Sequence, residues 1–246
     1  MLDRIFGVHA VTSLLDSAPE RIVRLYLLDG RDDQKLQTLL RKAEALDVAI
    51  TRRDRKALDQ LTAGAVHQGV VAECKAAPQL REDDVESMLE TNRKPLLLVL
   101  DGITDPHNLG ACLRTADAAG VHAVIAPKDR SAVLNPTARK VACGAAERIP
   151  FISVTNLART LRMLKEHNVW VVGTAGEASE SIYQCKLNVP LALVMGAEGE
   201  GMRRLTREHC DQLINIPMFG SVSSLNVSVA TGVCLFEAVR QRSADV

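Results

Sequence analysis

Asn108 and Arg114 are the first residues in the chain whose types and spacing suit chemistry on a substrate that carries phosphate. They lie in the run 101–116, where Pro106 and Asn108 predict a turn into a helix that begins near Leu109 and has Arg114 in its second turn. Taken alone, Asn108 is explained better as the cap of that helix. Arg114 has small and apolar sequence neighbours, and an arginine held among such residues usually contacts a carboxylate or a phosphate through its planar guanidinium.

A second candidate is the glycine-rich run 196–202, which directly follows an apolar stretch. Its glycines, Gly196, Gly199 and Gly201, allow a ligand to approach the main chain closely. The order Gly-x-x-Gly-x-Gly is the reverse of the dinucleotide-binding spacing and comes late in the sheet region, which argues against an NAD-binding oxidoreductase. A plain turn remains an alternative, and Glu198 is also explained as a solvated loop charge.

The third candidate is the run 216–228, which is rich in serine and asparagine and leads into an apolar helical stretch at 229–239. Its polar residues either cap that helix or carry chemistry. Because the helix is apolar on nearly all sides, it must be buried on more than one face. This pattern indicates that the helix also packs against a second subunit.

The elements that must position these three runs belong to a C-terminal α/β block. Continuous apolar runs separated by helical stretches are typical of a parallel sheet covered on both faces. The runs are 96–100, 121–126, 169–172 and 191–195. Ligands of such sheets bind beyond the carboxyl ends of the strands, so the loops after Leu100, Met195 and Ile216 are where a site is expected.

The residues before this block form a smaller α/β unit. Extended patterns at 22–28, 48–51 and 69–74 alternate with helical repeats around Leu14 and Leu39. We therefore predict three parts: an N-terminal domain at 1–75, a linker with a short helix at 76–94, and a catalytic domain at 95–246.

Composition restricts the possible partners and the compartment. Lys and Arg number 30 and so do Asp and Glu, so any nucleic-acid binding must come from local patches. The six cysteines include no Cys-x-x-Cys pair, which favours small core residues in a reducing compartment over a zinc site or disulfides. No apolar run approaches the length of a membrane span, and a cytoplasmic protein is expected.

Together, the three runs resemble the motifs of the SpoU (TrmH-like) ribose methyltransferases of the SPOUT superfamily. The matching residues, in the family's order, are Asn108 with Arg114, residues 196–199, and residues 216–218 with 224–226. The resemblance covers residues 95–240, while 6–10 and 65–69 resemble the substrate-binding domain of the ribosomal RNA members. Over the whole chain the likeness is strongest to members that methylate a guanosine in the P-site loop of bacterial 23S ribosomal RNA.

The resemblance implies a fold, a cofactor and a set of partners. It implies an α/β fold with a deep trefoil knot in a mainly parallel C-terminal sheet, and a small N-terminal α/β domain that is ribosomal protein L30e-like. It also implies a homodimer that binds S-adenosylmethionine, uses no metal and acts on ribosomal RNA of the large subunit. Around 140–145 many relatives have a serine before the glycine, where this chain has Cys143, so the role of that segment stays open.

The resemblance further assigns roles to residues. The implied catalytic residues are Asn108, Arg114, Glu198, Ser224 and Asn226. The implied cofactor-binding residues are Gly196, Ile216, Met218, Leu225 and Asn226. Because a guanidinium does not deprotonate under ordinary conditions, we expect Arg114 to hold phosphate and stabilise developing negative charge instead of acting as the base.

RNA specificity is expected to reside in the N-terminal block. Its compact basic cluster is the run 52–56, which is equally well explained as a solvated helix start. His67, Gln68 and Gly69 are candidates for contacts with an exposed RNA loop, or else form a turn before a strand. A methyltransferase acting on transfer RNA and a non-catalytic RNA-binding protein of the same fold remain alternative functions.

Overall fold

The computed structural model describes residues 2–31, 33–78, 80–197 and 199–244. Contacts within the chain divide it into two compact units, which are described separately. Unit 1 consists of Met1–Pro78 with Arg139–Arg148, and unit 2 of Gln79–Ala138 with Ile149–Val246.

Unit 1 is a four-stranded mixed sheet with helices. Its elements are β1 (Leu2–Phe6), α1 (Val8–Ser17), a 3-10 helix (Pro19–Arg21), β2 (Ile22–Leu28), α2 (Gln34–Ala45), β3 (Ile50–Arg53), α3 (Arg55–Leu61), β4 (Val70–Lys75) and a later 3-10 helix (Ala145–Glu147). The strand order is β1-β4-β2-β3. Strands β1 and β2 run antiparallel to β4, whereas β2 and β3 are parallel. The pattern analysis predicted the last three strands and missed β1.

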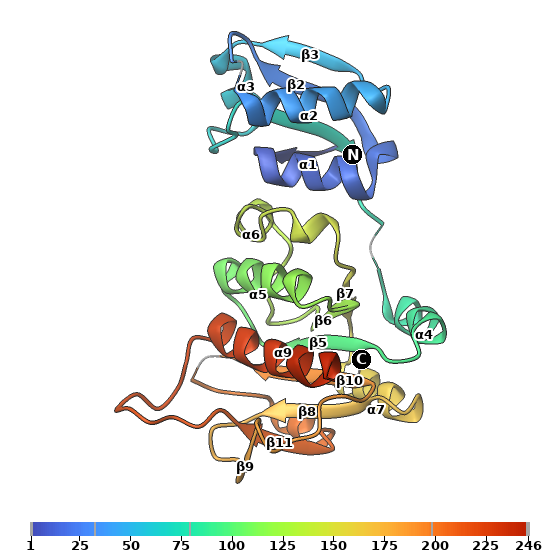
Figure 1. The fold of residues 1–246 in the computed structure, drawn as a ribbon, viewed down its shortest axis with the longest axis vertical. Helices are drawn as coiled ribbons and strands as arrows, with labels where there is room; N and C mark the ends of the chain where they lie inside the picture. Colours follow the sequence, from blue (N-terminus) through green and yellow to red (C-terminus); the bar gives the residue numbers. More distant parts are fainter. Residues whose placement is uncertain (1, 32, 79, 198, 245–246) are drawn as a thin grey trace. The chain divides into compact units, whose positions relative to one another are not determined.

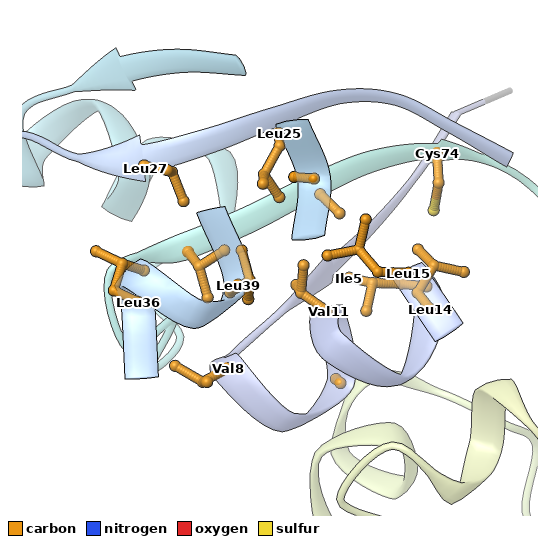
Figure 2. Packing of buried hydrophobic residues seen from close by; sticks show 14 residues of the cluster. Ile5, Val8, Val11, Leu14, Leu15, Leu25, Leu27, Leu36, Leu39 and Cys74 are labelled. Carbon is orange, nitrogen blue, oxygen red and sulfur yellow. The ribbon is translucent and has the colours of Figure 1, made fainter. Parts of the chain in front are cut away.

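The core of unit 1 lies between one face of its sheet and the helices α1 and α2. Figure 2 shows Val11 and Leu14 of α1 and Leu39 of α2 beside Leu25 of β2, and all four side chains are buried. Ser13, also on α1, donates a hydrogen bond of 2.7 Å to the carbonyl of Gly144 within the same unit. Segment 139–148 is therefore attached to unit 1 by polar contacts as well as by packing.

Unit 2 contains a seven-stranded sheet of order β7-β6-β5-β10-β8-β11-β9, in which every named pair of neighbours is parallel. The strands are β5 (Leu96–Asp101), β6 (Ala123–Pro127), β7 (Phe151–Val154), β8 (Trp170–Thr174), β9 (Glu180–Ser181), β10 (Leu191–Gly196) and β11 (Gln212–Asn215). The helices are α4 (Glu82–Thr91), α5 (Pro106–Ala118), α7 (Leu157–Glu166), α8 (Arg204–Glu208) and α9 (Val227–Ser243), and α6 (Pro136–Val141) begins in unit 2 and ends in unit 1. The predicted parallel sheet is confirmed.

Helices cover both faces of this sheet. Leu97 and Val99 of β5 pack in one cluster with Val85 of α4 and Leu161 of α7. Successive side chains of a strand point to opposite faces, so the neighbouring leucines of β5 face the other layer. Figure 1 shows α5 and α9 side by side in that layer, and the two helices contact each other. Burial on both faces explains why β5 is entirely apolar before its last residue.

Four cysteines are the small core residues that their surroundings predict, namely Cys74, Cys112, Cys185 and Cys234. Cys210 is half-buried, and Cys143 is exposed, so the prediction is wrong for Cys143. Cys143 has a positive φ of 51° in a turn before Gly144, which explains its place at the surface. Among the described residues, no helix has the length and apolar character needed to cross a membrane.

Candidate active site

The three candidate loops leave the sheet of unit 2 at the same edge, because they follow the carboxyl ends of parallel strands. Strands β5 and β10 are neighbours, and Gly196 is paired with Asp101 in their register. Strand β11 lies beyond β8 in the same sheet. The first two loops therefore begin side by side, and the third begins two strands away from β10.

The first loop leads into α5 three residues earlier than the sequence predicts. Helix α5 begins at Pro106, and the carboxylate of Asp105 accepts a hydrogen bond of 2.9 Å from the main-chain N–H of His107. The predicted start near Leu109 is therefore wrong, as is the explanation of Asn108 as the helix cap. Asp105 with a proline at the first helical position is a sufficient helix start. Asn108 consequently lies inside the first turn of α5.

A hydrogen bond joins the first and third loops. The side-chain amide of Asn226 donates to the side-chain oxygen of Asn108 at 3.0 Å. Asn226 is also the cap of α9, because its side-chain oxygen accepts from the main-chain N–H of Ser228 at 2.9 Å. Thus Asn226 serves as helix cap and inter-loop contact together. Two predicted site residues that are 118 positions apart in the chain are brought into contact.

Arg114 lies on another side of α5. The buried residues of this helix include Leu109, Cys112, Leu113 and Ala116, which repeat at helical spacing, whereas Arg114 is exposed. The inference that Arg114 is held among its apolar sequence neighbours is wrong, because those neighbours turn toward the core and the arginine turns away. It stands about 9 Å further along the helix axis than Asn108, since each residue rises about 1.5 Å.

The glycine loop after β10 folds back on itself. A Cβ atom at Gly196 would lie 2.3 Å from the main-chain carbon of Gly201 and from the nitrogen of Met202, so only glycine fits there. Ala197 and Gly201 exchange main-chain hydrogen bonds of 3.0 and 2.9 Å. Glu198, which was predicted as a catalytic residue, lies outside the described residues.

The third loop contains the remaining predicted site residues. Ile216 and Met218 are half-buried just after β11, and Leu225 is half-buried next to the cap of α9. Ser224 is exposed in the same loop. The hydrogen bond from Asn226 to Asn108 places the end of this loop at α5, while the beginning of the loop lies at the sheet edge.

Sequence analysis missed two residues that hold these loops. Asp101, the last residue of β5, is fully buried, and its Oδ2 accepts a hydrogen bond of 2.8 Å from the main-chain N–H of Arg203. The Nε of Arg203 lies 3.5 Å from the other carboxylate oxygen of Asp101. The signal was a carboxylate ending an otherwise apolar run, since a charged group is rarely buried without a partner.

Buried thiols of unit 2 are not nucleophiles at neutral pH. Burial raises the pKa of the Cys210 thiol to about 12 and that of the Cys234 thiol to about 12. Both stay protonated, and the thiolate is the reactive form of cysteine. Among the described residues, no group of three or more His, Cys, Asp or Glu residues is placed to hold a metal ion.

In unit 1, His67 is not available for an RNA contact. It is 4% exposed, its Nδ1 accepts a hydrogen bond of 3.0 Å from the N–H of Gly69, and its Nε2 lies 3.1 Å from Oδ1 of Asp59. The expectation that His67 reads RNA is wrong, and the alternative of a turn before the strand is confirmed. The Gln68 side chain accepts from the N–H of Val8 at 3.0 Å, which satisfies the first turn of α1.

The basic cluster 52–56 is exposed. Arg52 and Arg53 end β3, while Arg55 and Lys56 begin α3, where the carboxylate of Asp54 accepts from the N–H of Ala57 at 2.8 Å. The run is thus a strand end joined to a solvated helix start. Its side chains remain at the surface of unit 1.

Comparison with known families shows to which protein family this chain belongs. The model of the SpoU rRNA Methylase family matches residues 95–236, which include all three loops and most of unit 2. The chain belongs to the SpoU rRNA methylase family. A second family model, described as RNA 2'-O ribose methyltransferase substrate binding, matches residues 4–80. The resemblance read from the motifs is thereby confirmed.

Two similar members of the SpoU family are named 23S rRNA (guanosine-2'-O-)-methyltransferase RlmB. The protein of Photorhabdus laumondii is 64% identical over 99% of this chain and 100% of its own length. That of Escherichia coli is 63% identical, again over 99% of this chain and 100% of the relative. The likeness to both relatives thus extends over nearly the whole chain.

A solved structure of the SpoU methyltransferase AviRb from Streptomyces viridochromogenes, in complex with the cofactor AdoMet, has the same fold. It aligns with a TM-score of 0.81 at 24% identity, over 99% of this chain and 91% of that one. The predicted α/β architecture of a SpoU protein with a small additional α/β unit is therefore confirmed.

Proposed function

We propose that this protein transfers a methyl group from S-adenosylmethionine to the ribose 2'-hydroxyl of a guanosine in the P-site loop of bacterial 23S ribosomal RNA. The proposal is carried by one observation. The segments that contain Asn108 and Asn226 meet at the edge where the glycine loop leaves the sheet, in a chain whose full-length relatives bear the name of that activity.

The residues of the glycine loop fit a cofactor held by main-chain groups. Gly199 and Gly201 have positive φ angles of 78° and 70°, and nothing lies within 4 Å of the position of a Cβ atom at either residue. The space beside the Cα atoms of both glycines is therefore open, while the N–H and carbonyl of Gly201 are bonded to Ala197. Gly196, Ile216 and Leu225 would hold the donor mainly through main-chain groups, and Met218 and Asn226 would contribute neighbouring contacts.

Bound S-adenosylmethionine supplies a methyl group that its sulfonium already activates. The chain must therefore align the ribose oxygen and help it to lose a proton. Alignment of two partners in reactive geometry contributes roughly 7–11 kcal/mol to lowering a barrier. Asn108 and Asn226 fix the first loop against the third, and Ser224 orients the nucleophile.

Arg114 acts on the RNA in this mechanism. Its exposed guanidinium binds the phosphate beside the target ribose and stabilises negative charge that develops on the oxygen. The proton leaves to phosphate or water, because a guanidinium remains protonated. Glu198 completes the proposed catalytic set.

We propose that the protein works as a homodimer in the cytoplasm. In support, α9 buries one face within the chain, while Val229 and Phe236 remain 52% and 50% exposed on another. These residues are seven positions apart and so share one side of the helix, with the half-buried Val233 between them. An apolar stripe of this kind is typical of a surface that a second subunit covers.

The remaining assignments follow from family membership. Residues 1–75 select the RNA, 76–94 form the linker, and 95–246 form the catalytic domain with a deep trefoil knot. The exposed cluster 52–56 supplies phosphate contacts, because ribosomal RNA attracts local basic patches even on a chain with no net charge.

The activity is tested by mapping 2'-O-methylation across ribosomal and transfer RNA in cells with and without this protein. We expect one guanosine in the P-site loop of 23S RNA to lose its methyl group, and wild-type protein to restore it. The proposal is contradicted if ribosomal RNA is unchanged, or if the lost methyl group belongs to a transfer RNA. We expect the Arg114→Ala variant not to restore this methyl group, which would show that the modification needs catalysis and not RNA binding alone.

A further inference from the structure

Asp101 lies at the centre of a hydrogen-bonding network that joins three loops of unit 2. Its carboxylate follows the apolar residues of β5 and is fully buried. One oxygen accepts from the main-chain N–H of Arg203, at the far end of the glycine loop. The other oxygen, Oδ1, is buried without a hydrogen bond and faces Nε of Arg203 at 3.5 Å.

Arg203 extends this network to the loop after β6. Its Nη2 donates to the carbonyl of Asp129 at 3.1 Å and to that of Arg130 at 3.4 Å. The same region is tied to the first loop, because the carbonyl of Ile103 accepts a main-chain hydrogen bond of 2.6 Å from Ala132. Loops that follow β5, β6 and β10 thus share one set of contacts.

The glycine loop is attached in three ways. Ala197 and Gly201 exchange main-chain hydrogen bonds across it. At its beginning, Gly196 packs directly against the main chain of Gly201 and Met202. At its end, the attachment is the hydrogen bond from the Arg203 N–H to Asp101. Nothing lies within 4 Å of the position of a Cβ atom at Gly199 or Gly201. Without the carboxylate, the returning half of the loop loses its link to β5, the strand that leads into the first loop.

We propose that Asp101 is a positioning residue that fixes the glycine loop in the form that receives the methyl donor. The inference rests on the proposed function, since it takes this loop to be the donor site. Asp101 acts through the main chain of Arg203 and does not touch the reacting atoms. A hydrogen bond to an ionised acceptor is about twice as strong as a neutral one, which suits a carboxylate to this task.

The first test measures the loop itself, with no donor present. Hydrogen exchange of the full chain should show faster exchange at the amides of Gly201 to Arg203 in Asp101→Ala, by about tenfold or more, because a protected N–H loses its acceptor. Asp101→Asn, which keeps an acceptor but removes the charge, should give an intermediate increase. Arg203→Ala retains the main-chain N–H, so its exchange should rise less than that of Asp101→Ala, although it removes the guanidinium that faces Oδ1.

The second test measures donor-site affinity by calorimetry with S-adenosylhomocysteine. The dissociation constant should rise by about tenfold in Asp101→Ala, a change of about 1.4 kcal/mol. The matched control is Arg204→Ala, since Arg204 is exposed and forms an ion pair with the exposed Glu208. Its affinity and exchange should equal those of wild type.

Two results would overturn the inference. One is unchanged exchange and affinity in both Asp101 variants. The other is hydrogen exchange that rises to the same extent along β5, β10 and α5, together with a loss of donor-site affinity that equals the fraction of unfolded protein. Those two results together would indicate that Asp101 only stabilises the fold. Failure of wild type to bind S-adenosylhomocysteine counts against the proposed function instead, because the exchange measurement does not depend on it.

Discussion

His67 in unit 1 and Asp101 in unit 2 are both buried polar residues next to a strand, and their surroundings differ. His67 has a partner at each ring nitrogen, within a turn of its own unit. Asp101 holds the end of the glycine loop, and its other oxygen is buried without a hydrogen bond from the described residues. A buried polar residue that is satisfied locally supports the fold, whereas one that joins several loops can position a site.

The same contrast holds for the two sheets. In unit 1 the polar groups at the ends of strands and helices bond to one another, as when the Gln68 side chain accepts a hydrogen bond from the N–H of Val8. In unit 2 the carboxyl ends of parallel strands gather loops from distant parts of the chain, as in the contact of Asn108 with Asn226. Chemistry is therefore expected in unit 2, and RNA selection by surface groups in unit 1.

The largest effect is expected from Arg114→Ala, which should reduce the methylation rate by about 10²–10³-fold because a charge-stabilising group is lost. The affinity for S-adenosylhomocysteine should stay within about twofold, since the arginine acts on the RNA. Single-turnover rates and calorimetry measure the two quantities. Arg114→Lys should restore little activity, because lysine lacks the two-pronged geometry. Equal losses of methylation rate and of S-adenosylhomocysteine affinity would contradict the proposal that Arg114 acts on the RNA and not on the donor.

Gly196→Ala should weaken donor binding by more than about tenfold, because the added Cβ meets the main chain of Gly201 and Met202 at 2.3 Å. Calorimetry with S-adenosylhomocysteine measures the change. Gly176→Ala is the matched control, since nothing lies within 4 Å of a Cβ at that position. Comparable binding by the two variants would show that the close approach in the glycine loop is not needed.

His67→Ala should destabilise unit 1 by about 1–3 kcal/mol, because the buried N–H of Gly69 loses its acceptor. Trp170 is the only tryptophan and lies in unit 2, so its fluorescence reports that unit during urea unfolding, while circular dichroism reports both. We expect an earlier transition by circular dichroism with an unchanged fluorescence midpoint. His9→Ala, at an exposed position of α1, should have no effect. A fluorescence midpoint that shifts equally would mean that the units do not unfold separately.

The smallest effect is expected from pH. In the folded state the pKa of the Cys210 and Cys234 thiols is about 12, above the ordinary value of 9.0. A raised folded-state pKa of a thiol gives stability that is complete below pH 9 and is lost as pH rises from 9 toward 12. The urea midpoint of Trp170 fluorescence should therefore fall above pH 9. Substituting both thiols by alanine should flatten this fall, whereas Cys143→Ser should leave it unchanged.

Much of the fold was predictable from the sequence because its signals are local. The run at 22–28 coincides with β2, and the apolar run at 96–100 forms β5 up to its last residue. Strand β1 was missed because its short sequence alternates weakly and is defined by pairing with β4, a non-local contact. The local pattern also predicted the wrong first residue for α5, because Asp105 and not Asn108 caps this helix.

The candidate site was predictable in its residue types and less so in its contacts. The family resemblance named Asn108 and Asn226, but no periodicity predicts that two residues so far apart share a hydrogen bond. His67 was misjudged because its type suits RNA recognition, while its burial depends on packing that the sequence does not display. Asp101 was passed over because its partner is a main-chain group, which has no signature in the sequence.

The central claim is that the loops after β5, β10 and β11 form one site for a sulfonium donor. A crystal structure of the full chain with S-adenosylhomocysteine tests it most directly. We predict the ligand against the main chain of Gly196, Ile216 and Leu225. A ligand bound elsewhere, or no ligand at saturating concentration, would contradict the account.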